Sequence, residues 1–204
     1  MALPRYDKTK RRQTFEQLPK GAYVVKIIGA KEDTWPDGSK VVKIAFDIAE
    51  GPYKGYYNNI FEQRKKDNEN ALWPFDGVFN LNVPDDSSDE KTWRNYNTFF
   101  ADLEDSNNGF VFSGDLKTLK RKLIGGKFRI KQTQAKKPNK DGAFPIYNNT
   151  EMLYTCVAED VRQGKAGKLP NDKLLAGGVA SGSGNTELDG FVNLPAGGDE
   201  DLPF

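Results

Sequence analysis

The 204-residue sequence predicts a mainly β fold, and three observations carry this prediction. Apolar and polar residues alternate from Val41 to Glu50, as they do in a half-buried antiparallel strand. Turn residues separate stretches that are rich in Tyr, Val and Ile, for example at Trp35-Pro36-Asp37-Gly38. Apolar residues recur at helical spacing over one long stretch, Thr92 to Asp105. Strands therefore dominate the expected structure, with a helix inserted between them.

The first part of the chain is expected to form a three-stranded meander. The first strand covers Ala22 to Glu32, and the Trp35 turn leads into the second strand, which ends at Glu50. Gly51-Pro52-Tyr53-Lys54-Gly55 turns the chain again. The aromatic-rich segment from Tyr56 to Glu62 is then expected to be the third strand.

The middle of the chain is expected to hold the helix. Residues 63–87 are polar and read as irregular structure. Asp85, Asp86 and Asp89 fit a solvated loop that leads into a helix cap. The helix from Thr92 to Asp105 places its aromatic residues on one face, which predicts that the following side chains lie in the core: Trp93, Tyr96, Phe100 and Leu103.

Two further strands are expected to complete the fold. A short amphipathic segment from Leu116 to Ile124 ends at Gly125-Gly126 and feeds a strand from Lys127 to Thr133. The closing strand runs from Met152 to Val161, where a small buried role is expected for Cys156. Three strands, a helical insertion and two strands are the order of an OB-fold, a five-stranded barrel. Another small barrel and an α+β sandwich remain open on this pattern.

The last residues of the chain differ in composition from the rest. Residues 169–204 hold six acids and one base, which leaves 23 acids and 29 bases in residues 1–168. We expect an OB-fold domain at 1–165 with a basic, flexible arm at 1–17, a disordered Gly/Ser-rich linker at 166–198 and an acidic tip at 199–204. A basic body with an acidic tail suits a polyanionic partner.

Composition also excludes several classes of function. The chain has no histidine and one cysteine, which removes the commonest general base and any Ser/His or Cys/His pair. No catalytic residue, metal or cofactor is therefore expected, although a metal-dependent nuclease built on Asp85, Asp86 and Asp89 is a remote alternative. No apolar run is long enough to cross a membrane, and the first twelve residues are too polar for a secretion signal, so a soluble intracellular protein is expected.

Binding of single-stranded nucleic acid requires spaced cations and aromatic faces on which bases stack. The candidates are Lys26, Trp35, Lys43, Tyr53, Lys54, Tyr56, Tyr57, Lys127, Arg129, Lys131 and Tyr154. Three cations alternate on one face of the Lys127–Thr133 strand, and Trp35 lies in a turn that is one wall of an OB-fold cleft. A solvated strand face, and packing rather than stacking for the tyrosines at 53–57, remain alternatives. The lysines at 136, 137 and 140 fit the loop between strands four and five, and a solvated loop without a binding role is the alternative.

The tip is expected to bind protein. Its six residues are Asp199, Glu200, Asp201, Leu202, Pro203 and Phe204. An apolar pocket with a basic rim would accept Phe204 and its terminal carboxylate. The tip resembles the C-terminal tail of single-stranded DNA-binding proteins (SSBs) of bacteria and their phages, which implies recruitment of replication and repair proteins. A frayed terminus without a role is the alternative.

Two segments of the body carry a second resemblance. Leu18-Pro19-Lys20-Gly21-Ala22-Tyr23 and Phe46-Asp47-Ile48-Ala49-Glu50-Gly51-Pro52-Tyr53-Lys54-Gly55-Tyr56-Tyr57 are similar to phage-encoded SSBs from viruses of Gram-positive bacteria. The resemblance implies an OB-fold, binding of single-stranded DNA with little sequence preference, and a role in phage replication and recombination in the cytoplasm of the infected host. A homo-oligomer is possible. The second hypothesis is an adaptor whose OB-like body binds protein while its tail competes for partners of the host SSB.

Overall fold

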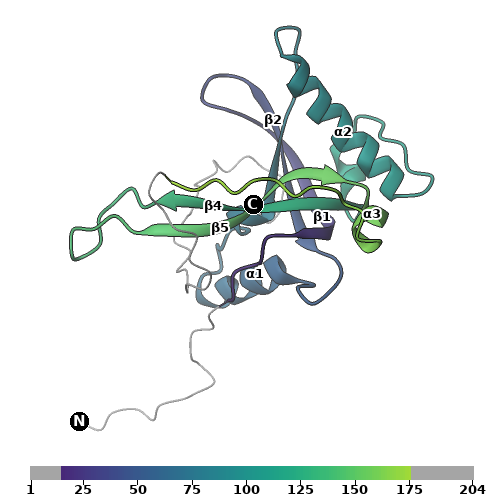
Figure 1. Ribbon diagram of the computed structural model, residues 1–204. Helices are drawn as coiled ribbons and strands as arrows, with labels where there is room; N and C mark the ends of the chain where they lie inside the picture. The colour runs from purple at the N-terminus through teal and green to yellow at the C-terminus, as the bar shows by residue number, and fades with distance from the viewer. Residues whose placement is uncertain (1–14, 176–204) are drawn as a thin grey trace.

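Residues 15–175 are described in the computed structural model, where they form one antiparallel sheet with helices packed around it (Figure 1). The five strands lie in the order β3-β2-β1-β4-β5. They are β1 (Ala22–Thr34), β2 (Lys40–Ile48), β3 (Val78–Asn82), β4 (Leu123–Gln134) and β5 (Ile146–Cys156). The mainly β fold is confirmed. The sheet is open, because β3 and β5 are its two edges and are not hydrogen-bonded to each other.

The first hairpin agrees with the sequence prediction. β1 and β2 pair antiparallel from Val25 opposite Ile48 to Thr34 opposite Lys40, with a register shift between Ile27 and Gly29. The apolar face of this hairpin is buried, and Phe46 packs edge-on against Phe128 of β4 with ring centroids 5.7 Å apart. These contacts join the first two strands to β4 in the core.

The third strand does not lie where the sequence predicted it. Tyr56–Asp67 forms the helix α1, and β3 lies in the segment that was expected to be irregular. The carboxylate of Asp47 accepts a hydrogen bond from the amide N–H of Tyr57 at 2.9 Å. This N–H is in the first turn of α1 and has no acceptor within the helix. Tyr57, Ile60 and Phe61 are buried at helical spacing. This packing outweighs the β propensity of the aromatic residues.

Helix α2 (Glu90–Ser106) confirms the helix predicted from Thr92 to Asp105, but one of the four residues predicted to lie in the core does not. The Asp89 side chain caps the helix by accepting from the N–H of Thr92 at 2.8 Å. The buried stripe is centred on Phe99 and Leu103, whereas Trp93 is 43% exposed and is not a core residue. Trp93 lies in the first turn of α2, beyond that stripe.

The end of the fold differs from the prediction in its boundaries. Only Leu116–Leu119 of the amphipathic segment is helical, as the short 3-10 helix η3, and Gly125 and Gly126 lie inside β4. A Cβ atom on Gly125 would lie 2.8 Å from the carbonyl oxygen of Cys156, so the close approach of β5 requires glycine there. β5 ends at Cys156, which is buried as expected, and the short helix α3 (Ala158–Arg162) follows.

The chain after α3 runs back along β4. The N–H of Gln132 donates to the carbonyl of Lys173 at 2.8 Å, and the N–H of Lys173 donates to the carbonyl of Ile130 at 2.9 Å. Asp172 also pairs with Lys20 at 3.0 Å. The expected flexible linker therefore has its first ten residues, 166–175, in the ordered fold. Residues 1–14 and 176–204, with most of the basic arm, the rest of the linker and the tip, lie outside the described residues.

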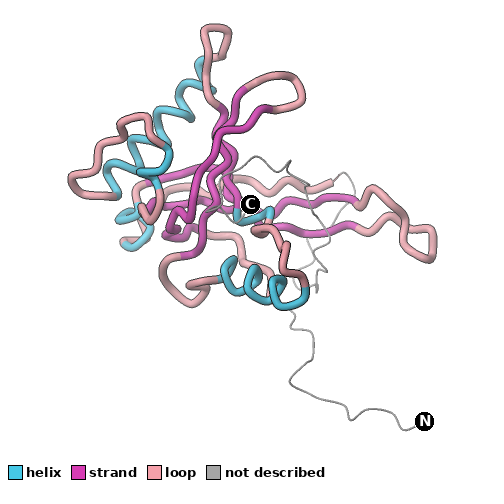
Figure 2. The backbone as a smooth tube through the Cα atoms, turned by 180° about the vertical axis from the view of Figure 1, so that it is seen from behind, coloured by secondary structure: helices cyan, strands magenta, loops and turns pink. Residues whose placement is uncertain are grey.

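The β4–β5 hairpin projects from the rest of the fold. Seen from behind, its two strands and the loop that joins them extend beyond α1 and α2 (Figure 2). Only β4's first residues pair with β1, from Leu123 opposite Lys26 to Lys127 opposite Ala22. The outer half of β4 is paired with β5 and bonded to Lys173. The outer part of this hairpin, residues 129–150, is called the arm below; it is distinct from the basic N-terminal segment at residues 1–17.

Candidate nucleic-acid interface

Trp35 is held at the tip of the β1–β2 hairpin. Its indole N–H donates to the side-chain oxygen of Asn82, at the end of β3, at 3.0 Å. The ammonium of Lys43 lies 5.8 Å from the centroid of the ring, and it pairs with Asp33 at 2.5 Å. Because the indole N–H already has a partner, a ligand would contact this half-buried ring through its aromatic surface.

Polar side chains continue from Trp35 across β2 and β3. In the sheet register Lys43 of β2 stands opposite Asn80 of β3 on one side and Lys31 of β1 on the other. Asn80 has no side-chain hydrogen-bond partner within residues 15–175. A cation on β2 and an amide on the edge strand β3 therefore lie next to each other.

A cavity of about 330 Å³ lies between the two edge strands, β3 and β5, and is called the seam below. Helix α2 and the 3-10 helix η2 (Phe75–Gly77) close parts of it. It is lined by Phe75, Asp76, Val78, Phe79, Asn80, Leu81, Asn82, Lys91, Thr92, Asn95, Thr98, Lys131, Glu151, Met152, Leu153, Tyr154 and Thr155. Tyr154 is 45% exposed. The seam therefore connects Tyr154 and Lys131 to the strand that holds Asn80 and Asn82.

The three cations of β4 are not a bare cationic surface. Arg129 and Lys131 both pair with Glu151 of β5, at 2.5 and 2.7 Å. Burial disfavours the charge on Glu151, but hydrogen bonds from Lys131 and Arg129 outweigh it and hold the pKa of Glu151 below its usual value. Lys127 is half-buried, and its charge acts on Asp102 and Cys156. The charge available to a phosphate backbone on this face is smaller than the sequence indicated.

The unpaired cations of this region lie on the β4–β5 loop instead. None of the three lysines at 136, 137 and 140 forms an ion pair within the described part of the chain. The Asn139 side chain orders the loop by accepting from the N–H groups of Asp141 and Ala143 at 3.0 and 2.9 Å. Phe144 is 48% exposed beside them. The sequence reasoning missed Phe144, although an aromatic residue next to a lysine tract was a usable signal.

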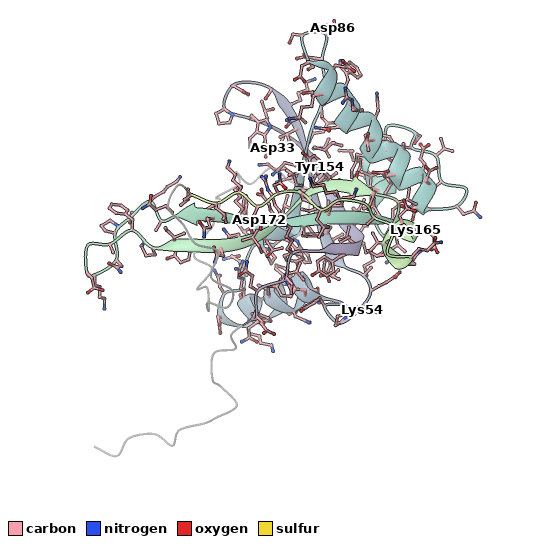
Figure 3. All side chains as sticks on the ribbon, in the orientation of Figure 1. Asp33, Lys54, Asp86, Tyr154, Lys165 and Asp172 are labelled. Atoms are coloured by element: carbon pink, nitrogen blue, oxygen red, sulfur yellow. The ribbon has the colours of Figure 1, made fainter. Side chains whose placement is uncertain are left out.

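A second group of candidates lies elsewhere, around α1. Tyr57 is 1% exposed and packs on Phe46, so it cannot stack on a base. Tyr56 is half-buried, and its hydroxyl donates to the carbonyl of Glu16 at 2.9 Å. Burial is the main cause that raises the pKa of Tyr56 to about 12. Lys54 is at the α1 side of the sheet, away from Tyr154 (Figure 3).

The two segments that resemble phage SSBs meet in this second group. Tyr23 and Tyr53 pack edge-on with centroids 5.9 Å apart, and the N–H of Leu18 donates to the Tyr56 hydroxyl at 3.2 Å. Lys26 is exposed and stands opposite Asp47 in the sheet. These contacts build a structural corner, so Tyr53 serves packing here.

The acids that the nuclease alternative requires are not gathered into a metal site in the part of the chain that the structure describes. Within residues 15–175 no three Asp, Glu or Cys side chains are grouped to hold a metal ion, and Asp85 and Asp89 are engaged with Ser87, Ser88 and Thr92. None of the helices in that range is long and apolar enough to cross a bilayer. Trp35, Lys43, Lys131 and Tyr154 are the predicted residues that the structure brings together around β3 and the seam.

Comparison with known proteins adds one match. Residues 5–102 match a family model. Its description is "Protein of unknown function (DUF669)", and the matched span is slightly less than half of the chain. It contains β1, β2, α1, β3 and most of α2, but neither strand of the arm. No curated protein matches the chain. The DUF669 match thus covers the Trp35 hairpin and one edge of the seam, and gives them no function.

We expect Trp35 to report ligand binding by its fluorescence. Stacking of a base on the indole would quench it, so Trp35→Phe should lose most of the quenching that oligo-dT causes in the wild type. Trp93→Phe is the matched control, because Trp93 is exposed on α2 and, unlike Trp35, makes no contact with β3 through its indole N–H. Equal loss of quenching in the two variants would contradict a role for Trp35.

Asp76 is expected to make stability depend on pH. Desolvation, then the charge of Glu151, raises the pKa of Asp76 to about 7 against the opposing charges of Lys131 and Arg64. The folded state therefore holds a proton that the unfolded chain releases near pH 4. The resulting stability is complete below about pH 4 and is lost as pH rises through about 7.

Asp76→Asn tests this dependence by urea unfolding at pH 5 and pH 8. The variant should gain stability relative to the wild type as pH rises, by at most about 1.4 kcal/mol per pH unit. Comparing the two proteins at each pH cancels the contributions of other titrating groups, such as Asp47 and Asp102. A difference that is the same at both pH values would show that the Asp76 carboxylate is solvated as in the unfolded chain.

Proposed function

We propose that this protein binds single-stranded DNA with little sequence preference, as a phage-encoded SSB does. One observation carries the proposal: the exposed Tyr154 and unpaired amides line the seam, Trp35 is fixed next to it by Asn82, and unpaired lysines lie on the loop of the arm. Stacking on aromatic side chains contributes about 1–3 kcal/mol per base, and phosphate contacts supply affinity without reading sequence. The surface formed by Trp35, Lys43, Asn80, Tyr154 and loop 135–145 is called the candidate interface below.

The strand order supports an OB-fold reading of the sheet. Joining β3 to β5 would close the observed order into a five-stranded barrel, and OB-folds are partly open Greek-key barrels. The long helix α2 lies between β3 and β4 in the chain. In an OB-fold the face of strands 2 and 3 and the loops 1–2 and 4–5 bind oligonucleotides. The corresponding parts of this chain are β2–β3, the Trp35 turn and loop 135–145.

The sequence resemblances support the biological setting of the proposal. The two segments at 18–23 and 46–57 resemble phage SSBs, and residues 199–204 resemble their protein-binding tip. We therefore propose that the protein covers exposed strands during phage replication and recombination in the host cytoplasm. The tip, outside the described residues, would bring replication and repair proteins to these strands. Self-association is compatible with this role.

An adaptor is the second candidate function, because the open edges of β3 and β5 could pair with a strand of another protein. Fluorescence anisotropy of labelled oligo-dT, titrated with the full-length protein at several salt concentrations, separates the two. The proposal expects saturable binding whose logarithm falls linearly with the logarithm of salt concentration. Absence of binding at low salt would contradict it and favour the adaptor.

A further inference from the structure

The seam differs from the rest of the candidate interface because it is a concave, partly open space rather than a flat surface. Its volume of about 330 Å³ is at the lower end of the ~300–1,000 Å³ of small-molecule sites. An extended strand of five residues is about 17 Å long and needs a groove rather than a cavity of this size. The space therefore fits one flat ring system better than a peptide.

Residues with aromatic and amide side chains line this space from three elements. Tyr154 comes from β5, Asn80 from β3 and Asn95 from α2. Neither asparagine has a side-chain hydrogen-bond partner among residues 15–175. An amide offers both a donor and an acceptor, so these side chains can bond to the edge of any base. A ring that stacked on Tyr154 would have its edge within the same cavity as the two amides.

The charges in the seam distinguish a base from a phosphate. The carboxylate of Glu151 and the carboxyl group of Asp76 line the cavity, and the negative charge of Glu151 disfavours entry of a phosphate. Lys91 and Lys131 line it as well, and Lys91 forms no ion pair within the described part of the chain. Cations beside a carboxylate-lined cavity suit a nucleotide whose base enters while its phosphates remain outside.

We propose that the seam between β3 and β5 binds one unstacked nucleobase of the DNA strand, with its face on Tyr154 and its edge on Asn80 and Asn95. The inference rests on the proposed function and assigns it a base-binding pocket. The pocket is continuous with the Trp35 turn, because Asn82 lines the seam and accepts the hydrogen bond of the Trp35 indole. One base is then held in the cavity while neighbouring bases contact the open surface.

The test compares oligo-dT with an abasic oligomer of the same length, using anisotropy and the full-length protein. Tyr154→Leu should weaken binding of oligo-dT about tenfold and leave binding of the abasic oligomer unchanged. Asn95→Leu should show the same pattern with a smaller loss. Asn97→Leu is the matched control, because Asn97 lies on the same helix and does not line the seam.

Each result decides the inference. A loss that is confined to oligo-dT supports a base in the seam. An equal loss on both oligomers would show that these residues contact the sugar-phosphate backbone of the DNA, and would overturn the inference. Wild-type affinity in Tyr154→Leu and Asn95→Leu would also overturn it while leaving the proposed function intact. If the wild type binds neither oligomer, both proposals fail together. Matching circular dichroism and melting of all variants verifies that each one folds.

Discussion

Replacing Lys136, Lys137 and Lys140 together by glutamine is expected to weaken binding of oligo-dT about 100-fold at 0.1 M salt. These lysines are unpaired and lie on the loop that an OB-fold uses as one wall of its cleft. Each phosphate contact on a single strand contributes about 0.7 to the slope of log affinity against log salt. The slope should therefore flatten by about 2, and anisotropy at four or more salt concentrations measures it.

A control variant separates local contacts from total charge. Replacement of Lys54, Lys66 and Lys165 by glutamine removes the same charge from residues outside the candidate interface. This control variant should change the slope of log affinity against log salt by less than the ~0.7 expected for one phosphate contact. If the two triple variants lose affinity equally, binding depends on the net charge of the body and loop 135–145 is not part of the interface.

Deleting Leu202 to Phe204 is expected to abolish capture of host replication and repair proteins. Phe204 would fill an apolar pocket of the partner, and the carboxylates of residues 199–201 would speed encounter with its basic rim. Affinity for oligo-dT should stay the same, because the deletion removes no charged side chain and leaves residues 15–175 unchanged.

Pull-down from a lysate of a Gram-positive bacterium measures this effect, with Phe204→Ala as the smallest change. A synthetic peptide of residues 196–204 should release the captured proteins, and the same peptide without its last three residues should not. Equal recovery by full-length protein, deletion and Phe204→Ala would assign no partner-binding role to the tip. The DNA-binding proposal would stand in that case, because it depends on residues 15–175.

The parts of the fold that were predictable depend on neighbouring residues in the chain. The β1–β2 hairpin and α2 follow from alternation, a turn and a capping aspartate within a few residues of each other. The third strand was misplaced, because α1 is stabilised by a residue outside the local pattern. The N–H of Tyr57 donates to the side chain of Asp47, which lies ten residues earlier in the chain. β3 has five residues, too few for a clear alternating pattern.

The same distinction applies to the candidate interface. Trp35 was identified because its turn is visible in the sequence. The pairing of Arg129 and Lys131 with Glu151 depends on the register of β4 and β5, so the sequence overstated the charge of that strand. The seam joins residues from η2, β3, α2 and β5, and no local pattern places Asn80 near Tyr154.

Photo-crosslinking tests most directly the central claim, that single-stranded DNA lies across the candidate interface. Oligo-dT in which single thymines are replaced by iodouracil is bound to the full-length protein, irradiated and mapped by mass spectrometry. We expect crosslinked peptides that contain Trp35, Tyr154 and Phe144, and their loss when unlabelled oligo-dT competes. Crosslinks confined to peptides of Tyr53 and Tyr96, or crosslinks that competitor does not reduce, would contradict the claim.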